Sequence, residues 1–183
     1  MIKEAIQRKL ALYFQLHYVQ TRMPDFIIGG LDDAYLLRWY ITPWTAWRRD
    51  VPDKDRSWWF RLVARLPAIY LHVFLRDDDD RALHDHPWNN VSWVLLGSYI
   101  EHTIRAGGIH VRTLRPRGSV KFRFARTAHR VELINRAPCM SLFFTGWRWR
   151  HWGFHCPDRG WVPWRVFTAV NDGDRGAIGR GCN

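Results

Sequence analysis

The residues best suited to chemistry are two histidines separated by one residue, in the segment His84-Asp85-His86. Side chains two positions apart on a strand point to the same face, so His84 and His86 can present two imidazoles to one metal ion. Asp85 then points to the opposite face, where it either supports the ligands or lies at the surface. Two histidines at this spacing are more often structural than metal-binding. The surrounding sequence therefore has to show whether this pair binds a metal.

The spacing beyond this pair resembles the first motif of the cupin superfamily. Asn90 follows His86 by four residues, and Gly97 follows Asn90 by seven. The family usually has Glu at the position of Asn90 and Gly at that of Gly97. The glycine that opens the family motif is replaced here by Asp78.

A second stretch resembles the second cupin motif. His129 follows Gly118 by eleven residues, as the metal-binding histidine of that motif follows its first glycine. Phe124 and Arg126 stand where the family has a proline and a further glycine. The two motifs together cover residues 70–146, under half of the chain.

The resemblance implies an antiparallel, mainly all-β cupin barrel that binds one divalent metal ion through His84, His86 and His129. Asn90 in place of Glu removes the charged ligand and leaves three neutral imidazoles, with open positions for water or substrate. Thiol dioxygenases, which are also cupins, are similar in holding iron through three histidines, so the resemblance favours Fe(II). Imidazole ligands also suit zinc or nickel.

Two further blocks are similar to those of bacterial and phage cupin-domain proteins without a settled activity. These blocks are LHDHPW at residues 83–88 and WGFHCP at residues 152–157.

The hydrophobic pattern predicts an all-β body preceded by a helix. Five short runs rich in β-branched and aromatic residues, separated by Gly and Pro turns, predict strands at residues 69–75, 91–96, 120–124, 131–134 and 140–144. We therefore predict one domain with three parts: a helical or irregular N-terminal extension packed on the barrel (1–68), the barrel (69–170) and an irregular tail (171–183).

Within the extension, residues 2–20 predict a helix whose buried stripe contains Ile2, Ile6, Leu10, Tyr13 and Leu16. Residues 23–30 contain Pro24 and a Gly29-Gly30 pair, which predict a loop. Residues 50–56 are charged and predict an exposed loop.

Five residues besides the histidine ligands are candidates for lining the site: Asn90, Trp88, Glu101, Arg123 and His155. A turn at Gly97-Ser98 would place Glu101 opposite Val94 in a hairpin, inside the barrel but several residues from the ligands. Glu101 then either faces the substrate or pairs with an arginine, since buried charges are usually paired. Arg81 or Arg123 would bind an acidic group of the ligand.

The C-terminal region adds weaker candidates. His155 is considered as a fourth ligand and Cys156 as a reactive thiol, although a buried inert cysteine is the commoner state. The tryptophans between residues 147 and 164 alternate with arginines, a pattern that can stack nucleic-acid bases but more often forms an aromatic core with cation–π contacts. His17, His72, His102 and His110 are expected to be structural or surface residues.

Composition limits the class of protein. With 47% hydrophobic residues and 12 tryptophans, the chain has the apolar content of a folded domain. Arg, Lys, Asp or Gln interrupts every apolar run, so no membrane span is expected. The three cysteines, Cys139, Cys156 and Cys182, have no paired spacing, which argues against disulfides and favours the cytoplasm.

The formal net charge of +11 favours contact with anions. Because the arginines are dispersed and no base-reading motif is present, we expect only non-specific binding of polyanions. The expected partner is a small molecule, acidic in character, and a homodimer is left open. The functions considered are a metal-dependent oxygenase, a non-catalytic cupin with a structural metal, and a basic nucleic-acid-associated protein. The fold alone does not choose among them.

Overall fold

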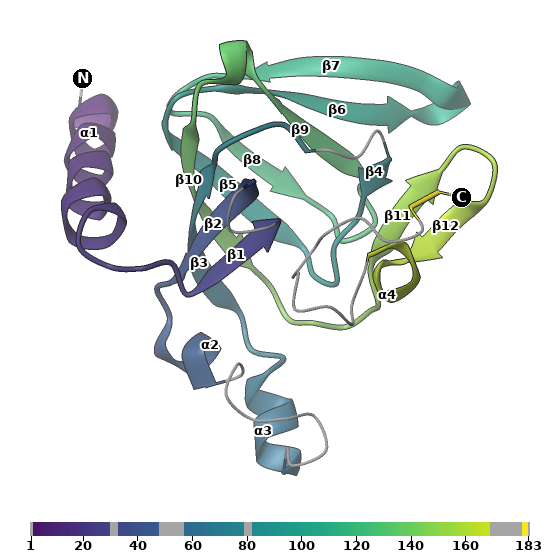
Figure 1. Ribbon diagram of the computed structural model, residues 1–183, viewed down its shortest axis with the longest axis horizontal. Coiled ribbons are helices and arrows are strands. Elements are labelled where there is room, and N and C mark those ends of the chain that lie inside the picture. The colour runs from purple at the N-terminus through teal and green to yellow at the C-terminus, as the bar shows by residue number, and fades with distance from the viewer. Residues whose placement is uncertain (1, 30–32, 48–56, 79–81, 169–180, 183) are drawn as a thin grey trace.

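A computed structural model describes residues 2–29, 33–47, 57–78, 82–168 and 181–182. The body consists of two six-stranded antiparallel sheets (Figure 1). Sheet A has the order β1 (Phe26–Gly29), β2 (Ala34–Tyr40), β3 (Ala68–Phe74), β10 (Cys139–Thr145), β5 (Asn90–Leu96) and β8 (Val120–Arg123). Sheet B has the order β12 (Gly160–Pro163), β11 (Gly153–Cys156), β4 (Leu83–His84), β9 (His129–Leu133), β6 (Tyr99–Arg105) and β7 (Ile109–Arg115).

Eight of these strands form a jelly roll. Sheet A contributes β3, β10, β5 and β8, and sheet B contributes β4, β9, β6 and β7. The chain crosses from one sheet to the other at nearly every connection, so neighbours in each sheet are distant in sequence. This is the strand order of the double-sheet jelly roll, or double-stranded β-helix, in which two Greek keys enclose an interior. The predicted fold class is confirmed.

All five predicted strands are present, as β3, β5, β8, β9 and β10. The prediction for the N-terminal extension is wrong in part, because β1 and β2 extend sheet A beyond β3. Phe26, within the segment that was expected to be a loop, pairs with Arg38 of β2. The aromatic and branched residues of the two strands outweigh the turn signals of Pro24 and the glycines.

The predicted hairpin between residues 91–96 and Glu101 is also wrong. β5 pairs with β10 and β8, whereas β6 pairs with β7 and β9. At Gly97-Ser98 the chain passes from sheet A to sheet B instead of folding back. Glu101 therefore lies opposite Val131 and Thr113, in a different sheet from Val94.

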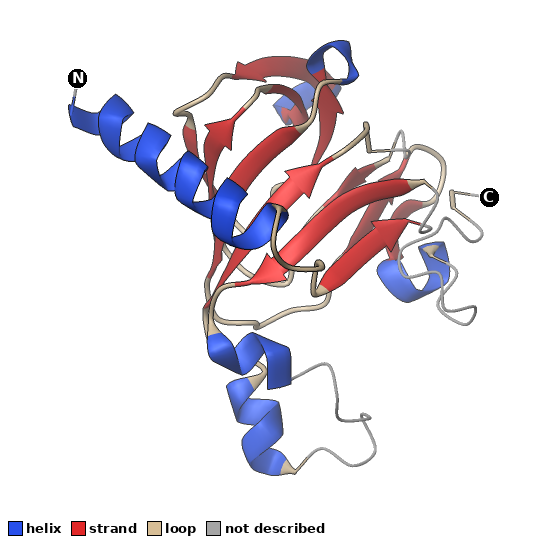
Figure 2. Cartoon of the chain, turned by 60° about the vertical axis from the view of Figure 1, so that its left-hand side comes forward, coloured by secondary structure: helices blue, strands red, loops and turns tan. Residues whose placement is uncertain are grey.

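The predicted N-terminal helix is confirmed as α1 (Ile2–Phe14), which continues as a π-helical turn over Gln15–Val19. It lies against the outer face of sheet A (Figure 2). Its buried face differs from the predicted stripe: Gln7, Ala11 and Phe14 are buried, while Ile6 and Tyr13 are about half exposed, at 50% and 48%. The Gln7 amide donates to the carbonyls of Val94 and Leu95, which fixes the rotation of the helix.

The other helical segments are short. α2 (Pro43–Trp47) and α3 (Trp58–Val63) project from one end of the barrel, and α4 (Trp164–Phe167) follows β12 (Figures 1 and 2). Two 3-10 turns occur at Ala106–Gly108 and Ile134–Arg136. The predicted loop at residues 50–56 lies outside the described residues. No helix within the described ranges has the length and apolar content needed to span a bilayer.

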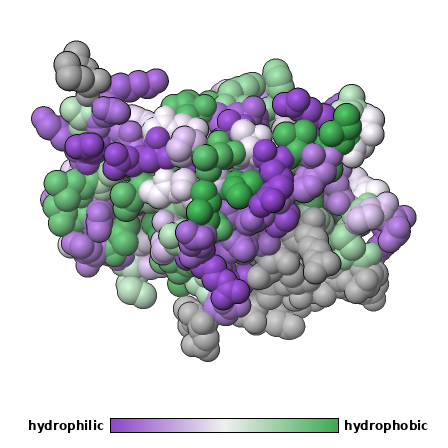
Figure 3. Space-filling view, turned by 90° about the horizontal axis from the view of Figure 1, so that it is seen from above, coloured by the Kyte–Doolittle hydropathy of each residue, from purple (hydrophilic) through white to green (hydrophobic). Residues whose placement is uncertain are grey.

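The largest cluster of buried apolar residues lies outside the barrel, between α1 and sheet A. This cluster is formed by Ala11, Phe14, Trp39, Leu71, Val73, Leu95, Met140 and Leu142. On the face seen in Figure 3, hydrophilic and hydrophobic side chains are interleaved and do not form one continuous band.

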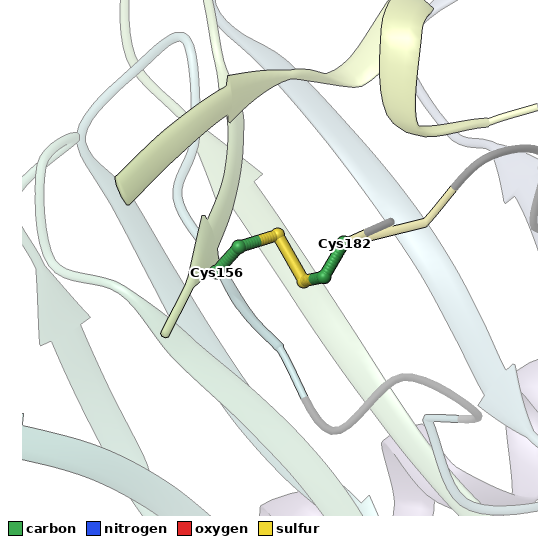
Figure 4. Close-up of a disulfide and its surroundings, with 2 residues drawn as sticks. All are labelled: Cys156 and Cys182. Atoms are coloured by element: carbon green, nitrogen blue, oxygen red, sulfur yellow. A yellow bond between two sulfur atoms is a disulfide. The ribbon is translucent and has the colours of Figure 1, made fainter. Parts of the chain in front are cut away.

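The expectation of unpaired cysteines is wrong, because Cys156 and Cys182 form a disulfide (Figure 4). The bond links β11 to a residue 26 positions further along the chain. Cys156 is therefore not the free thiol considered above, and the argument for the cytoplasm loses its premise. Cys139 is a buried free cysteine, and burial raises the pKa of its thiol to about 12. The rest of the predicted tail, up to residue 180, lies outside the described residues.

The fold explains why the first motif ends in glycine. Gly97 has φ +74, and a Cβ there would lie 2.6 Å from the carbonyl oxygen of Pro138. We expect Gly97→Ala to lower the free energy of unfolding by about 3 kcal/mol, because it combines a left-handed backbone with a backbone clash. Urea denaturation measures this change.

Gly107 is the matched control for this prediction. It has φ +82, but a Cβ there would have nothing within 4 Å. Gly107→Ala should cost only the backbone term, about 1 kcal/mol. Equal losses in the two variants would contradict the close approach at Gly97.

Candidate metal centre

The three histidines predicted to bind metal come together in the structure. His84 lies in β4 and pairs across the strands with His129, the first residue of β9. His86 lies two residues beyond His84, where its backbone N–H donates to the carbonyl of Ala125. One possible ligand atom from each of the three residues lies within 4.8 Å of the others. Among the described residues, this is the one His, Cys, Asp and Glu cluster with such geometry.

The ring nitrogens suit a divalent ion. His86 Nε2 lies 2.8 Å from His129 Nε2, and the rings of His84 and His129 are 4.9 Å apart. Two imidazole nitrogens at 2.8 Å either share one proton or both offer lone pairs to a third atom. Three such nitrogens match the ligand set that zinc, iron and nickel accept.

Electrostatics keep these imidazoles in the ligating form. Burial lowers the pKa of His86 and of His129 well below the ordinary value, and the charge of Arg123 lowers both further. A histidine binds metal only through a deprotonated nitrogen. Both rings are therefore neutral, with a lone pair available, over the physiological pH range.

Carboxylates lie behind two of the three imidazoles, on the Nδ1 side of each. Asp78 Oδ2 is 3.1 Å from His84 Nδ1, and Glu101 Oε1 is 3.4 Å from His129 Nδ1. These contacts are electrostatic, because neither Asp78 Oδ2 nor His129 Nδ1 has a hydrogen-bond partner within the described residues. A carboxylate beside Nδ1 favours a proton there and leaves Nε2 for the metal, an arrangement common at metal-binding histidines.

Strand order and histidine placement together decide the architecture. The eight central strands follow the jelly-roll order, and the metal-binding positions of the two sequence motifs meet on β4 and β9. The fold is that of a cupin.

Sequence comparison finds no matching family model and no significant match among curated proteins. Several solved structures are similar over part of the chain. Hydroxypropylphosphonic acid epoxidase from S. wedmorenis is 18% identical, with a TM-score of 0.44 over 68% of this chain and 57% of that one. Oxalate decarboxylase from Bacillus subtilis is 16% identical, with a TM-score of 0.43 over 73% of this chain and 29% of that one. An uncharacterised double-stranded β-helix protein from Klebsiella pneumoniae is 12% identical, with a TM-score of 0.40 over 49% of this chain and 75% of that one.

This chain spans less than two thirds of the length of the epoxidase and less than one third of the length of the decarboxylase. Similarity at this level bears on neither the substrate nor the reaction.

Glu101 lies closer to the ligands than the sequence predicted, and it is fully buried. It forms ion pairs with Arg123 and Arg115, so the arginine pairing considered from the sequence is present. The other donors of Arg123 contact Ser92 Oγ at 2.8 Å and Tyr99 OH at 3.0 Å. Because these internal partners use its donors, Arg123 does not suit the ligand-binding role expected of it.

Asn90 and Trp88 each hold a buried donor without a partner. Asn90 is 2% exposed, and its Oδ1 lies 3.5 Å from Arg123 Nη1. Its Nδ2 and the Trp88 Nε1 have no hydrogen-bond partner among the described residues. Trp88 packs against an aromatic cluster that contains Tyr70 and Phe143. Buried donors without partners are rare, which marks this part of the interior as polar and unsatisfied.

Asp85 points away from the other two residues of its segment, as the strand alternation predicted, but it is buried and not at the surface. It accepts from the Gly153 N–H, from Trp161 Nε1 and from Arg150. Burial alone would raise the pKa of Asp85, but hydrogen bonds from His155, Gly153 and Arg150 outweigh it and lower the pKa. The WGFHCP block thus contains β11, and Asp85 links the β11–β12 hairpin to the segment that carries His84 and His86.

The remaining candidates lie away from the ligands. His155 Nε2 faces Asp85 Oδ2 at 3.4 Å, and 42% of its side chain is exposed, so it is not brought to the three-histidine cluster. Arg81 lies outside the described residues. His102, His110 and Glu132 form a chain of contacts, with 2.8 Å between the two rings and 2.6 Å from His102 to Glu132. These contacts lie on the face of β6 opposite to the one that carries Glu101.

The sequence did not predict one hydrogen-bonded pair near the site, Arg38 and His72. His72 is buried on β3, and Arg38 lies opposite it on β2. Burial lowers the pKa of His72 well below its ordinary value, and the charges of Arg38 and His86 add to this effect. The alternation of residues 34–40 could have revealed a strand, but the turn signals before it hid the pairing.

These shifts give the metal-free protein a pH-dependent stability. His72, His86 and His129 stay neutral when folded, whereas the unfolded chain protonates them below about pH 6.5. The unfolded state then binds more protons, so the free energy of unfolding falls as pH drops below that value, by up to about 1.4 kcal/mol per pH unit for each histidine. Urea denaturation between pH 7.5 and 5.5 should show this slope, and His72→Gln should reduce it by one proton. Parallel curves for the parent and His72→Gln would contradict the assignment of His72.

Proposed function

We propose that this cupin binds one divalent metal ion through His84, His86 and His129 and uses it to oxygenate a small molecule. The observation that carries the proposal is the convergence of three ring nitrogens within 4.8 Å. Two of these rings are held neutral by burial, and two have a carboxylate on the Nδ1 side. Fe(II) is the favoured ion, with zinc or nickel as alternatives.

The chemistry divides between the ion and the chain. When bound, the ion supplies Lewis acidity and, as iron, redox chemistry toward dioxygen. Asp78 and Glu101 orient their histidines, and Asp85 holds the segment between His84 and His86 against the β11–β12 hairpin. Because Asn90 stands where a carboxylate ligand would add charge, the three imidazoles leave the positive charge of the ion uncompensated. An anionic substrate is therefore favoured at the open positions.

The alternative is a cupin that holds the same ion but does not turn over substrate. The ligand geometry is common to both functions, so metal content and dioxygen consumption have to be measured separately.

We expect the protein purified without chelator to carry close to one metal ion per chain, and His86→Ala to lose most of it. The reason is that two neutral ligands bind a divalent ion far more weakly than three. Plasma mass spectrometry measures the content, and His17→Ala, on the exposed end of the N-terminal helical segment, is the matched control. Full occupancy in His86→Ala would remove the basis of the assignment.

Turnover has its own test. Protein loaded anaerobically with Fe(II) should consume dioxygen when a panel of small thiols and carboxylic acids is added, and His86→Ala should stay at background. An oxygen electrode measures the consumption. Metal binding without dioxygen consumption would favour the non-catalytic alternative.

A further inference from the structure

Strand β2 carries an arginine, Arg38, that is held in a fixed orientation beside His72 of β3. Arg38 Nε donates to His72 Nε2 at 2.8 Å, from the neighbouring strand. The guanidinium lies over the ring of Tyr70, with its carbon 5.0 Å from the ring centroid, and 5.8 Å from that of Phe26. One hydrogen bond and two aromatic faces therefore orient the plane of the guanidinium.

A chain of ring contacts links this arginine to the predicted metal ligands. The His72 ring stacks on Phe143 at 5.0 Å, and Phe143 lies 5.7 Å from the ring of His86. The positive charge of Arg38 also contributes to the lowered pKa of His86. Arg38 and His86 are both partly exposed, whereas His72 and His129 behind them are buried.

Arg38 differs from the arginines of the interior in its partners. Arg123 and Arg115 pair with Glu101, and Arg150 pairs with Asp85. No carboxylate of the described residues lies within 4.0 Å of Arg38, and its hydrogen bond to His72 uses only Nε. Cations with restricted access to water are usually paired with an anion, so the two Nη groups of Arg38 are suited to one supplied by a ligand.

We propose that Arg38 binds the oxyanion group, carboxylate or phosphoryl, of the small molecule that this cupin takes beside its metal ion. The two Nη groups provide the fork that binds two oxygens of such a group. His72 acts as the positioning residue, because a neutral ring that accepts from Nε holds the fork in place. The proposal rests on the proposed function for its location beside a metal, but anion binding to Arg38 can be measured without the metal.

The experiment titrates metal-free protein with acetate and, separately, with inorganic phosphate, by isothermal calorimetry at low ionic strength. The parent should bind at least one of the two with a stoichiometry of one, and the preferred anion identifies the carboxylate or the phosphoryl class. Arg38→Gln should weaken this binding by roughly tenfold or more, the size expected for the loss of a charge-assisted pair. Arg38→Lys, which keeps the charge but not the fork, should fall between the two.

Arg105→Gln is the matched control, because Arg105 is exposed at the end of β6 and its loss changes the net charge by the same amount. It should change the affinity less than twofold. Equal affinity in the parent and Arg38→Gln, or no stoichiometric binding of either anion to the parent, would overturn the proposal. If Arg38→Gln does not fold, as judged by circular dichroism, Arg38→Lys decides on the same criterion.

The metal content of each variant separates this proposal from the proposed function. If the parent binds no metal but binds an anion, and Arg38→Gln loses the anion, the metal site is refuted and the anion site is retained. A parent that binds metal, with an affinity for both anions that is independent of Arg38, would do the reverse.

Discussion

The ion pair between Glu101 and Arg123 is the interaction on which the site depends. Glu101 belongs to β6 in sheet B and Arg123 to β8 in sheet A, so the pair joins the two sheets across the interior. Both side chains are almost completely buried, at 0% and 1% exposed. Losing one partner of such a pair is strongly destabilising, about 3–5 kcal/mol, because the other charge stays buried and unpaired. The same carboxylate faces His129, so the contact that joins the sheets also orients a predicted metal ligand.

Burial and nearby positive charge keep the histidines neutral but do not orient their rings. Burial lowers the pKa of His86 and of His129, and the charge of Arg123 lowers both further, which keeps their lone pairs available. Orientation then requires negative charge at defined points. Asp78 supplies it at His84, Glu101 at His129, and Asp85 at the backbone between the first two ligands. Asp78 contacts β9, Glu101 lies in β6 and Asp85 contacts β11, so each acid is held by a different strand of sheet B.

The part of the site that could be predicted from the sequence is the part determined by local geometry. Strand alternation places His84 and His86 together and Asp85 on the other side, and motif spacing adds His129. The positive φ of Gly97 and its close approach to Pro138 give the physical reason for a glycine at that motif position.

The contacts between sheets could not be predicted in the same way, because their partners are distant in the chain. Glu101 contacts Arg123 because the chain passes from sheet A to sheet B at Gly97-Ser98. The predicted hairpin at these residues would have kept Glu101 in sheet A. Arg38 meets His72 through β2, which the turn signals before it concealed. The disulfide joins two cysteines whose separation of 26 residues indicates no pairing by itself. The helix stripe failed for a related reason, since Gln7 and Ala11 face sheet A to satisfy carbonyls and permit close packing.

A large part of the apolar burial lies on the outer face of sheet A. Between the sheets the chain buries His72, His129, Arg123 and Glu101, and these groups contribute little net hydrophobic stabilisation. The largest apolar cluster instead lies on the opposite face of sheet A, where Ala11 and Phe14 of α1 cover Leu71, Leu95 and Leu142. The strands β3, β5 and β10 therefore place Leu71, Leu95 and Leu142 toward the helix. The alternate face of the same strands carries His72, Asn90 and Ser141. The N-terminal helix thus completes the largest apolar cluster of the protein, on the face of sheet A opposite the one that carries His72 and Asn90.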